Sequence, residues 1–356
     1  MNKSKIIQFL RKLLFPFGIV YGLIIFLRNR AFDWGFLHQT SFNIPIFVVG
    51  NITVGGTGKT PVTEYLIDLL YTKYSIGLLS RGYGRKTKGV IYADDTATAQ
   101  TIGDEPYQIK TKFPKIETCV AEKRVLGVNK LVNTGVDLII CDDAFQHRYL
   151  KPTRAIVVID YNRPLWKDCM LPAGELREYA SEINRADVVI VNKCPSDISY
   201  ATKELFLNKI ELANKQNIFF STYKYGTPIN LNDRTQELLS TKKIVAFSGI
   251  AQPKPFYHFL ENHYSVIDTI TFPDHHNFTE VELLDIAIRL QRINEDFAII
   301  TTEKDASRLK QFPTFKYSSE TWYLPIKIEI LFDEAGRFNN LIESYVTESQ
   351  RNNTFS

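Results

Sequence analysis

Stretches with strand-like and helical spacing alternate along the first two-thirds of this chain. Residues 44–52 form an apolar, β-branched run of strand length, and residues 62–70 place their apolar side chains at helical spacing. Further strand-like runs, separated by segments long enough for helices, lie at residues 75–79, 136–141, 155–159 and 187–191. This alternation predicts an α/β fold in which helices cover both faces of a parallel sheet.

The last third of the chain repeats the alternation on a smaller scale. A helical stretch over residues 200–217 and an extended linker over 219–232 precede strand-like runs at residues 243–247, 296–301 and 323–330. We therefore predict two α/β domains, preceded by a separate helix and followed by a polar tail. The four parts are an N-terminal helix at 1–35, a larger domain at 36–225, a smaller domain at 226–345 and a frayed polar tail at 346–356.

The N-terminal helix is unusually apolar. Residues 13–27 carry no polar side chain except that of Tyr21, and basic residues flank the run on both sides. The run is shorter than the roughly 20 residues of a spanning helix, contains Pro16, and is not followed by a signal-peptide cleavage site. It favours a helix at a membrane interface, with its basic flanks facing anionic headgroups; the alternative is a buried core helix.

Composition narrows the class of protein. With 356 residues, 44% of them hydrophobic and 23% charged, the chain is typical of a globular protein and too polar for a multi-spanning membrane protein. The formal net charge of +4 is too small to indicate nucleic-acid binding. Four cysteines lack metal-ligand spacing, which favours reduced thiols in the cytosol.

A phosphate-binding loop is indicated between the first predicted strand and helix. The loop TVGGTGKT comprises Thr53, Val54, Gly55, Gly56, Thr57, Gly58, Lys59 and Thr60. It fits the Gly-x4-Gly-Lys-Ser/Thr pattern except that Thr53 replaces the first glycine. The glycines leave backbone N–H groups accessible to phosphate, Lys59 can reach the β- and γ-phosphates of ATP, and the Thr60 hydroxyl can bind Mg²⁺.

Carboxylates follow a neighbouring predicted strand, as an ATP-dependent enzyme requires. Residues 136–141 are apolar apart from Asp137, and Asp142 and Asp143 follow directly. Together with Gln146 they are candidates for holding Mg²⁺ or its water ligands. His147 and Arg148 complete the stretch as candidate cations for phosphate.

Three other stretches are weaker candidates. SRGYGR at 80–85 is suited to gripping an anionic substrate or is a plain surface turn, and GDEP at 103–106 offers a general base in an acidic turn. FPDHHNF at 272–278 clusters Asp274, His275 and His276 in the smaller domain. If that loop is catalytic, closure of the two domains must bring it to the phosphate loop.

The order of these stretches resembles one enzyme family. GNITVGGTGKTP, SRGYGR, GDEP, DDAFQHR, LPAGELRE, FPDHHNF and TTEKDA follow one another as in the tetraacyldisaccharide 4'-kinases, the lipid A 4'-kinases of Gram-negative envelope biosynthesis. The similarity extends from the N-terminal helix to about Glu334. That family also has Thr at the place of the first loop glycine, whereas Tyr179 stands where it usually has Pro.

The resemblance implies a P-loop nucleoside-triphosphate hydrolase-like kinase domain at 36–225. It implies transfer of phosphate from ATP, with Mg²⁺, to the 4'-hydroxyl of tetraacyldisaccharide 1-phosphate, which gives lipid IVA. The implied location is the cytoplasmic face of the bacterial inner membrane, with monotopic or peripheral attachment through the N-terminal helix. The implied partners are the lipid-sugar substrate and the membrane surface; neither nucleic acid nor an obligate protein partner is implied.

The resemblance also assigns roles to individual residues. Asp104 resembles the catalytic base, assisted by His275, and Lys59 is catalytic at the ATP phosphates. The implied metal group is Thr60, Asp142, Asp143, Gln146 and Glu178, and the implied substrate group is Tyr83, Arg124, His147 and Arg177. Residue spacing by itself leaves Asp104, Asp142 and Asp143 all open as the base.

Two other functions remain compatible with these residues. One is a membrane-attached regulatory or assembly ATPase, in which hydrolysis changes the shape of a protein partner and the GDEP carboxylate is dispensable. The other is a nucleotide-binding protein with a degenerate loop.

Overall fold

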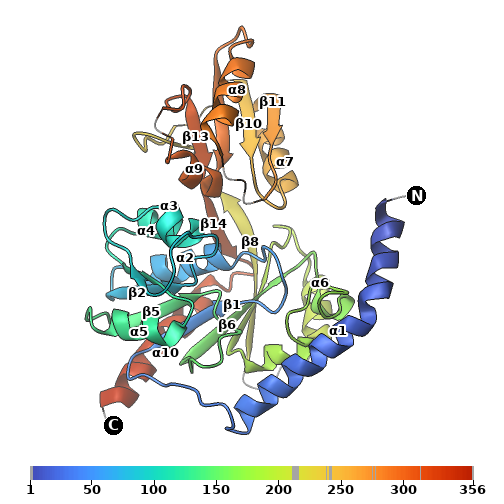
Figure 1. The fold of residues 1–356 in the computed structure, drawn as a ribbon, viewed down its shortest axis with the longest axis vertical. Helices are drawn as coiled ribbons and strands as arrows, with labels where there is room; N and C mark the ends of the chain where they lie inside the picture. The colour runs from blue at the N-terminus through green and yellow to red at the C-terminus, as the bar shows by residue number, and fades with distance from the viewer. Residues whose placement is uncertain are drawn as a thin grey trace.

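A computed structural model of the chain describes residues 3–210, 216–237, 239, 243–274, 276, 278–312 and 314–354. These residues form a nine-stranded sheet and a five-stranded sheet, each covered by helices (Figure 1). The strands β8 and β14 of the nine-stranded sheet extend towards the five-stranded sheet in Figure 1, and the chain passes between the two sheets there. The predicted α/β fold class is confirmed.

The nine-stranded sheet has the order β14-β8-β7-β6-β1-β5-β2-β4-β3. Its strands are β1 Ile46–Gly50, β2 Ile76–Ser80, β3 Ile91–Tyr92, β4 Glu117–Val120, β5 Leu138–Asp142, β6 Arg154–Asp160, β7 Val188–Asn192, β8 Asn217–Tyr225 and β14 Ile326–Ile330. The seven strands from β8 to β4 are parallel, and the edge strands β14 and β3 are antiparallel to their neighbours. The carboxyl ends of the parallel strands therefore meet at one edge of the sheet.

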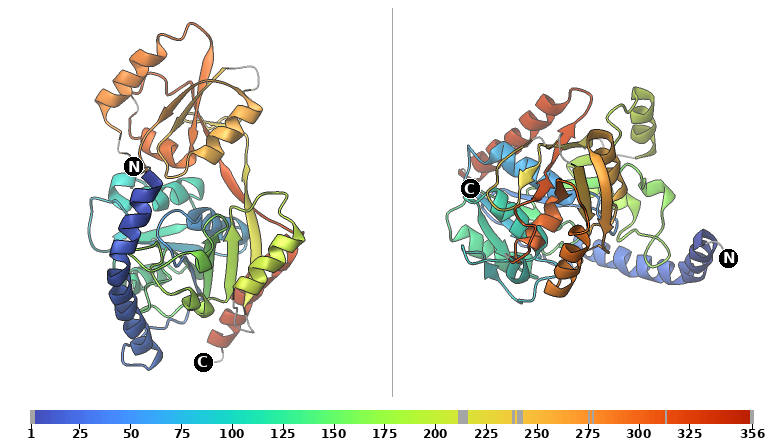
Figure 2. Two further views of the ribbon diagram at one scale, coloured as in Figure 1. Left: turned by 90° about the vertical axis from the view of Figure 1, so that its right-hand side faces the viewer. Right: turned by 90° about the horizontal axis from the view of Figure 1, so that it is seen from above.

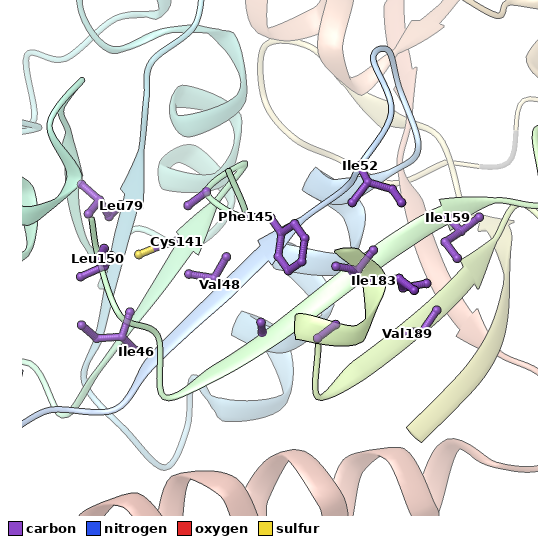
Figure 3. Packing of buried hydrophobic residues seen from close by; sticks show 14 of the residues in the cluster. Ile46, Val48, Ile52, Leu79, Cys141, Phe145, Leu150, Ile159, Ile183 and Val189 are labelled. Carbon is purple, nitrogen blue, oxygen red and sulfur yellow. The ribbon is translucent and has the colours of Figure 1, made fainter. Parts of the chain in front are cut away.

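Helices cover both faces of this sheet, because each central strand is apolar on both sides. In β1, Ile46 and Val48 pack into one core cluster while Phe47 and Val49 pack into the other. Figure 3 shows the first of these clusters around Val48 and Phe145. The helices of this unit are α1 Lys3–Asp33, α2 Lys59–Leu70, α3 Ala99–Ile102, α4 Asp104–Lys112, α5 Arg124–Val132, α6 Tyr200–Lys209 and α10 Ala335–Thr354.

The five-stranded sheet has the order β11-β10-β12-β13-β9. Its strands are β9 Ile229–Asn230, β10 Lys243–Ser248, β11 Ser265–Thr271, β12 Phe297–Thr302 and β13 Thr321–Leu324, and its helices are α7 Lys254–His263, α8 Glu280–Leu290 and α9 Glu303–Leu309. The alternating side chains of β10 again enter two core clusters, with Val245 in one and Ile244 in the other. The sheet therefore has its own core on each face.

Two sequence predictions about the connection between the sheets are wrong. The extended linker over 219–232 begins as β8, which pairs with β7 and with β14. The run 323–330, predicted as one strand, is divided between the two sheets at Pro325. Proline has no N–H to donate to a neighbouring strand, so the chain can pass from one sheet to the other at Pro325 without leaving an N–H group unpaired.

The prediction of a frayed tail at 346–356 is also wrong for the described residues. Helix α10 continues to Thr354, and Val346 is fully buried. Val346 packs with Phe338 and Ile342 in the cluster that includes α2. The polar composition of this segment belongs to the outer face of an amphipathic helix.

Helix α1 continues through Pro16 and lies along one side of the nine-stranded unit (Figure 2, left). The helix packs closely on this unit at two glycines. A Cβ on Gly22 would come within 2.5 Å of the Tyr179 hydroxyl, and a Cβ on Gly18 within 3.1 Å of the Met170 carbonyl oxygen. The opposite face exposes large apolar side chains, among them Phe17 and Leu23. The stretch 13–33 contains an 18-residue window that is apolar enough to cross a membrane, and 17% of that window is buried. Helix α1 is thus mostly exposed, unlike a core helix.

Candidate active site

The predicted site residues of the larger unit gather at the carboxyl edge of the nine-stranded sheet. The phosphate loop follows β1, the SRGYGR loop follows β2 and the Asp142-Asp143 pair ends β5. Because β5 is paired with both β1 and β2, these three segments are neighbours in space. Binding sites of open α/β sheets lie at this edge.

The phosphate loop is closed by tight backbone packing. Gly58 has a φ of 94°, and a Cβ there would lie 2.1 Å from Nδ2 of Asn192, so no other residue fits. Thr53 is buried and forms an isolated bridge with Leu176, and the Val54 N–H donates to the Glu175 carbonyl at 2.8 Å. The loop start is thus paired with LPAGELRE. Thr53 is not among the residues with positive φ, so its backbone conformation does not require glycine.

Two residues that support the loop were missed by sequence analysis. The Asn192 side chain donates to the Thr57 carbonyl at 3.0 Å. The Lys193 ammonium donates to the Gly56 carbonyl and lies 2.8 Å from Oδ2 of Asp160. Asn192 ends β7 and Lys193 follows it, so an Asn-Lys pair at the end of a buried strand was the available signal.

Asp142 is the buried member of the strand-end carboxylate pair. It accepts a hydrogen bond of 3.1 Å from the Thr63 hydroxyl of α2. Burial, followed by the negative charge of Asp143, raises the pKa of Asp142 to about 7. The positive charge of Lys59 offsets only part of this effect, so without a metal ion the Asp142 carboxyl group is partly protonated at neutral pH.

Asp143 is the charged member of the pair. Its Oδ1 lies 3.6 Å from the Lys59 ammonium and 3.3 Å from the Arg177 guanidinium. Burial acts to raise its pKa, but the positive charges of Lys59, Arg177 and Arg124 together hold the pKa below its ordinary value. The Arg124 guanidinium also donates to the Asp143 carbonyl at 3.3 Å, so three cations surround one residue.

The oxygen donors at this point fit Mg²⁺. Asp142 and Asp143 are adjacent, Asp142 carries an unfavourable buried charge, and Thr60 follows the Lys59 that contacts Asp143. Among the described residues no cluster of three His, Cys, Asp or Glu side chains forms a closed metal cage. Mg²⁺ is typically held by one or two carboxylates together with water and substrate phosphates, so an open site of this kind suits it.

Gln146 and Glu178 lie further along the same polar network. Glu178 is fully buried and accepts hydrogen bonds of 3.2 Å from Asn29, 2.6 Å from Arg185 and 3.4 Å from Gln146. The Arg177 guanidinium bridges Gln146 and Asp143, at 3.5 Å and 3.3 Å. The structure therefore connects Glu178 to the carboxylate pair through Gln146 and Arg177, and anchors it to α1 through Asn29.

The predicted cations His147 and Arg148 are not cations for phosphate in this structure. Burial, followed by the charges of Arg124 and Arg81, lowers the pKa of His147 to about 4, so its imidazole is neutral at pH 7. Arg148 is buried and directed at α1, where it donates to the Asn29 carbonyl at 2.8 Å and to Asp33 at 2.7 Å. Sequence spacing could not show either environment.

The SRGYGR loop packs directly on the GDEP segment. A Cβ on Gly103 would lie 2.9 Å from Cα of Gly82, and one on Gly82 would lie 2.5 Å from the Ile102 carbonyl oxygen. Both glycines have positive φ, 69° at Gly82 and 95° at Gly103. The two loops can approach so closely only because both positions lack a side chain, and the contact places Tyr83 next to the segment that carries Asp104.

Asp104 is the first residue of α4 and faces the unit of the five-stranded sheet. Its Oδ2 accepts hydrogen bonds from Nε and Nη2 of Arg308, at 2.9 Å and 2.7 Å. Lys304 lies 3.6 Å from both Glu105 and Asp274, so the FPDHHNF loop also approaches α4. The predicted assisting residue His275 lies outside the described residues.

Comparisons with known proteins agree with these features. A model of the family "Tetraacyldisaccharide-1-P 4'-kinase" matches residues 10–347. A tetraacyldisaccharide 4'-kinase of Bacteroides thetaiotaomicron is 40% identical, over 98% of this chain and 96% of that protein. The protein of the same name from Flavobacterium johnsoniae is 42% identical, over 96% of this chain and 98% of its own length.

A solved structure is similar as well. It is the crystal structure of the "apo" form of LpxK from Aquifex aeolicus in complex with ATP, which is 29% identical with a TM-score of 0.76 and covers 95% of this chain and 99% of that chain. The sequence and structural similarities extend over nearly the whole chain and include its phosphate loop, strand-end carboxylates and GDEP segment. The chain belongs to the tetraacyldisaccharide 4'-kinase family.

Proposed function

We propose that this chain transfers the γ-phosphoryl group of ATP to the 4'-hydroxyl of tetraacyldisaccharide 1-phosphate, giving the bis-phosphorylated lipid A precursor lipid IVA. Family membership supports this reaction. The observation that carries it is the ion pair of 3.6 Å between Lys59 of the phosphate loop and Asp143 of the strand end. The pair brings a phosphate-binding cation and candidate metal-binding carboxylates together at one edge of the sheet.

The phosphate loop binds and orients the ATP phosphates. Backbone N–H groups at Gly55, Gly56 and Gly58 line it, and the positive end of the α2 dipole lies behind them. Lys59 exchanges Asp143 for the β- and γ-phosphates. Thr60, Asp142 and Asp143 would hold Mg²⁺, which would supply positive charge to the phosphates, and Gln146 and Glu178 hold the surrounding network.

Asp104 accepts the proton of the sugar hydroxyl as the new P–O bond forms. A hydroxyl group is a weak nucleophile, and a carboxylate within hydrogen-bond reach removes its proton in the transition state. His275 assists Asp104 by the motif similarity of the family. Asp142 and Asp143 are poorer candidates for the base, because Asp142 is buried against Thr63 and both are the candidate Mg²⁺ ligands beside Lys59.

The remaining side chains hold the lipid-sugar substrate. Arg177 carries a positive charge next to Asp143, and Arg124 contacts the Asp143 carbonyl, so both border the reaction centre. A neutral His147 can donate or accept one hydrogen bond to a sugar hydroxyl. Tyr83 is exposed on the SRGYGR loop next to the GDEP segment, where it is accessible to an incoming sugar.

The substrate is presented at a membrane surface. The apolar outer face of α1 inserts into the interface, and its basic flanks contact anionic headgroups. The cytoplasmic face of the inner membrane is the side on which ATP is available. Attachment is monotopic or peripheral, and the reaction requires neither nucleic acid nor an obligate protein partner.

The test is transfer of labelled γ-phosphate from ATP and Mg²⁺ to detergent-dispersed tetraacyldisaccharide 1-phosphate. Wild type and Lys73→Ala should both form labelled bis-phosphorylated lipid, whereas Lys59→Ala should not. Lys73 is a matched control, because it lies beyond the other end of α2 and forms an exposed ion pair with Glu343. ATP hydrolysis by wild type without labelled lipid would instead support a membrane-attached ATPase.

A further inference from the structure

The candidate base is held by a guanidinium from the other unit. Arg308 of α9 lies 204 positions from Asp104 in the sequence, and its side chain is only 3% exposed. Its Nε and Nη2 atoms both donate to Oδ2 of Asp104. The fork therefore fixes Oδ2 with two hydrogen bonds and restricts the orientation of the whole carboxylate.

Arg308 is itself held rigidly. Its Nη1 donates to Oδ1 of Asp305 at 3.1 Å and to the Gly249 carbonyl at 3.3 Å. Asp305 is fully buried, and its Oδ2 accepts hydrogen bonds from the Gly249 N–H at 2.8 Å and the Thr302 hydroxyl at 2.7 Å. Gly249 follows β10 and Thr302 ends β12, so two strands of the five-stranded sheet fix the position of the guanidinium.

The same helix carries two further charged contacts with the larger unit. Glu303 lies 3.4 Å from Lys112 at the end of α4, and Lys304 lies 3.6 Å from Glu105. Lys112 is also paired with Glu64 of α2, the helix that follows the phosphate loop. Helix α9 therefore contacts α4 along its length, and its residue Arg308 contacts the candidate base, Asp104.

We propose that Arg308 is a positioning residue that orients the Asp104 carboxylate and does so only while α9 is docked on α4. The inference rests on the proposed role of Asp104 as the base. In this role Arg308 acts on Asp104 and not on the nucleotide: it holds Oδ2 and thereby sets the orientation of the carboxylate towards the sugar hydroxyl. Proton acceptance is thereby coupled to closure of the two units, since the guanidinium and the carboxylate come from different sheets.

The experiment compares kcat, KM for the lipid and Kd for ATP in wild type, Arg308→Gln, Arg308→Lys, Asp104→Asn and the double variant. We expect Arg308→Gln to lower kcat by roughly 100-fold, the order of loss found when a reacting group is misplaced. ATP affinity should stay within about twofold. Arg308→Lys should recover part of kcat, because it restores the charge but not the two-bond fork.

The double variant separates positioning from general stability. In the Asp104→Asn background, Arg308→Gln should lower kcat by less than about threefold, since coupled residues lose their effects non-additively. A full 100-fold additional loss, or an equal loss of ATP affinity, would overturn the proposal. If Arg308→Gln does not fold, wild-type kcat in Arg308→Lys would overturn it as well.

Two comparisons distinguish this inference from the function on which it rests. Wild-type kcat in Asp104→Asn would remove the base assignment and Arg308's role together. Low kcat in Asp104→Asn with wild-type kcat in Arg308→Gln would remove only the Arg308 proposal. Arg289→Gln is the matched control, because Arg289 lies on α8 and pairs with Asp268 of the same unit, and it should have wild-type kcat.

Discussion

Lys59 and Asp143 form an ion pair of 3.6 Å between Nζ and Oδ1. The cation that the loop offers to ATP is thus already matched with a carboxylate from the neighbouring strand. In the proposed mechanism a nucleotide phosphate replaces Asp143 at Lys59, and the released carboxylate becomes available to a metal ion. On that proposal the pair keeps the lysine side chain in place before ATP arrives and makes nucleotide and metal binding interdependent.

Asp143→Asn should separate these two effects. Without the competing carboxylate, metal-free ATP should bind severalfold more tightly, the range of a partly exposed ion pair. With Mg²⁺ present, kcat should fall by about 100-fold, because one metal-binding charge is lost. Titration of ATP with and without Mg²⁺, combined with turnover measurements, checks both effects.

Asp137→Asn provides the control for that experiment. Asp137 precedes the other end of β5 and accepts a hydrogen bond from the Ser75 N–H at 2.7 Å. It should leave ATP binding and turnover unchanged. Weaker metal-free ATP binding in Asp143→Asn than in wild type would contradict the competition between carboxylate and phosphate.

Asp142 should make the stability of the nucleotide-free protein fall as pH rises. Its pKa is near 3.8 when unfolded and about 7 when folded, so the folded chain retains a proton between these values. The stability contributed by this proton is therefore lost as pH rises from about 4 to 7. The side chain introduced by Asp142→Asn cannot ionise, and its amide oxygen can still accept a hydrogen bond from the Thr63 hydroxyl.

Denaturant unfolding of wild type and Asp142→Asn at pH 5 and pH 8 measures this effect. The variant should gain about 1 to 2 kcal/mol relative to wild type between the two pH values, below the upper limit of roughly 2.7 kcal/mol that two pKa units set between pH 5 and the folded pKa of about 7. Its kinase activity should fall at the same time. An identical pH dependence of the unfolding free energy in both proteins would show that Asp142 is not the buried acid.

Gly103→Ala should disturb the contact between the SRGYGR and GDEP loops. The new Cβ would lie 2.9 Å from Cα of Gly82, and φ is 95°, so the backbone at Asp104 must shift. We expect kcat to drop by more than about tenfold with little change in ATP affinity. Steady-state kinetics and ATP titration measure the two quantities.

Gly89→Ala separates backbone strain from steric clash. Gly89 has a similar φ of 80°, but a Cβ there would meet no atom within 4 Å. It should cost about 1 kcal/mol of stability and leave kcat near that of wild type. Equal losses of kcat in the two variants would indicate that the close packing of the loops is not what positions Asp104.

The outer face of α1 should determine membrane binding. Ile19 and Leu23 are both exposed and lie four residues apart on one side of the helix. Ile19→Ser with Leu23→Ser should weaken co-sedimentation with vesicles of phosphatidylethanolamine and phosphatidylglycerol by about 100-fold, or roughly 1.5 kcal/mol per side chain. Kinase activity towards detergent-dispersed substrate should be less affected.

An equal loss of apolar surface elsewhere serves as the control. Val281 and Leu284 are exposed on α8 of the smaller unit. Val281→Ser with Leu284→Ser should bind the same vesicles as wild type does. Comparable loss of binding in both double variants would mean that α1 is not the specific membrane contact.

Several features of this protein could be predicted from local sequence alone. The strand and helix around the phosphate loop followed from the hydrophobic pattern at 44–52 and 62–70. The loop itself followed from its glycines and Lys59, since Gly58 must adopt a left-handed conformation. The position of Asp142 and Asp143 followed from the end of an apolar run.

Other features depended on contacts between distant segments. Proline at 325 divides one apolar run between two sheets, and the strand order that results is not encoded in the spacing of side chains. The neutral state of His147 arises from burial and from Arg124 and Arg81, which spacing does not reveal. Asn192 and Lys193 support the phosphate loop from a strand two positions away in the sheet.

The sequence by itself determined the fold class, the phosphate loop and the family, because each depends on short stretches whose hydrogen-bonding and steric properties are local. Only the tertiary structure decided how the carboxylates are charged and which cation holds each of them. Asp104 meets Arg308 because β8 and β14 position the five-stranded sheet over α4. Electrostatic energies depend on burial and distance, and both are set by the folded chain as a whole.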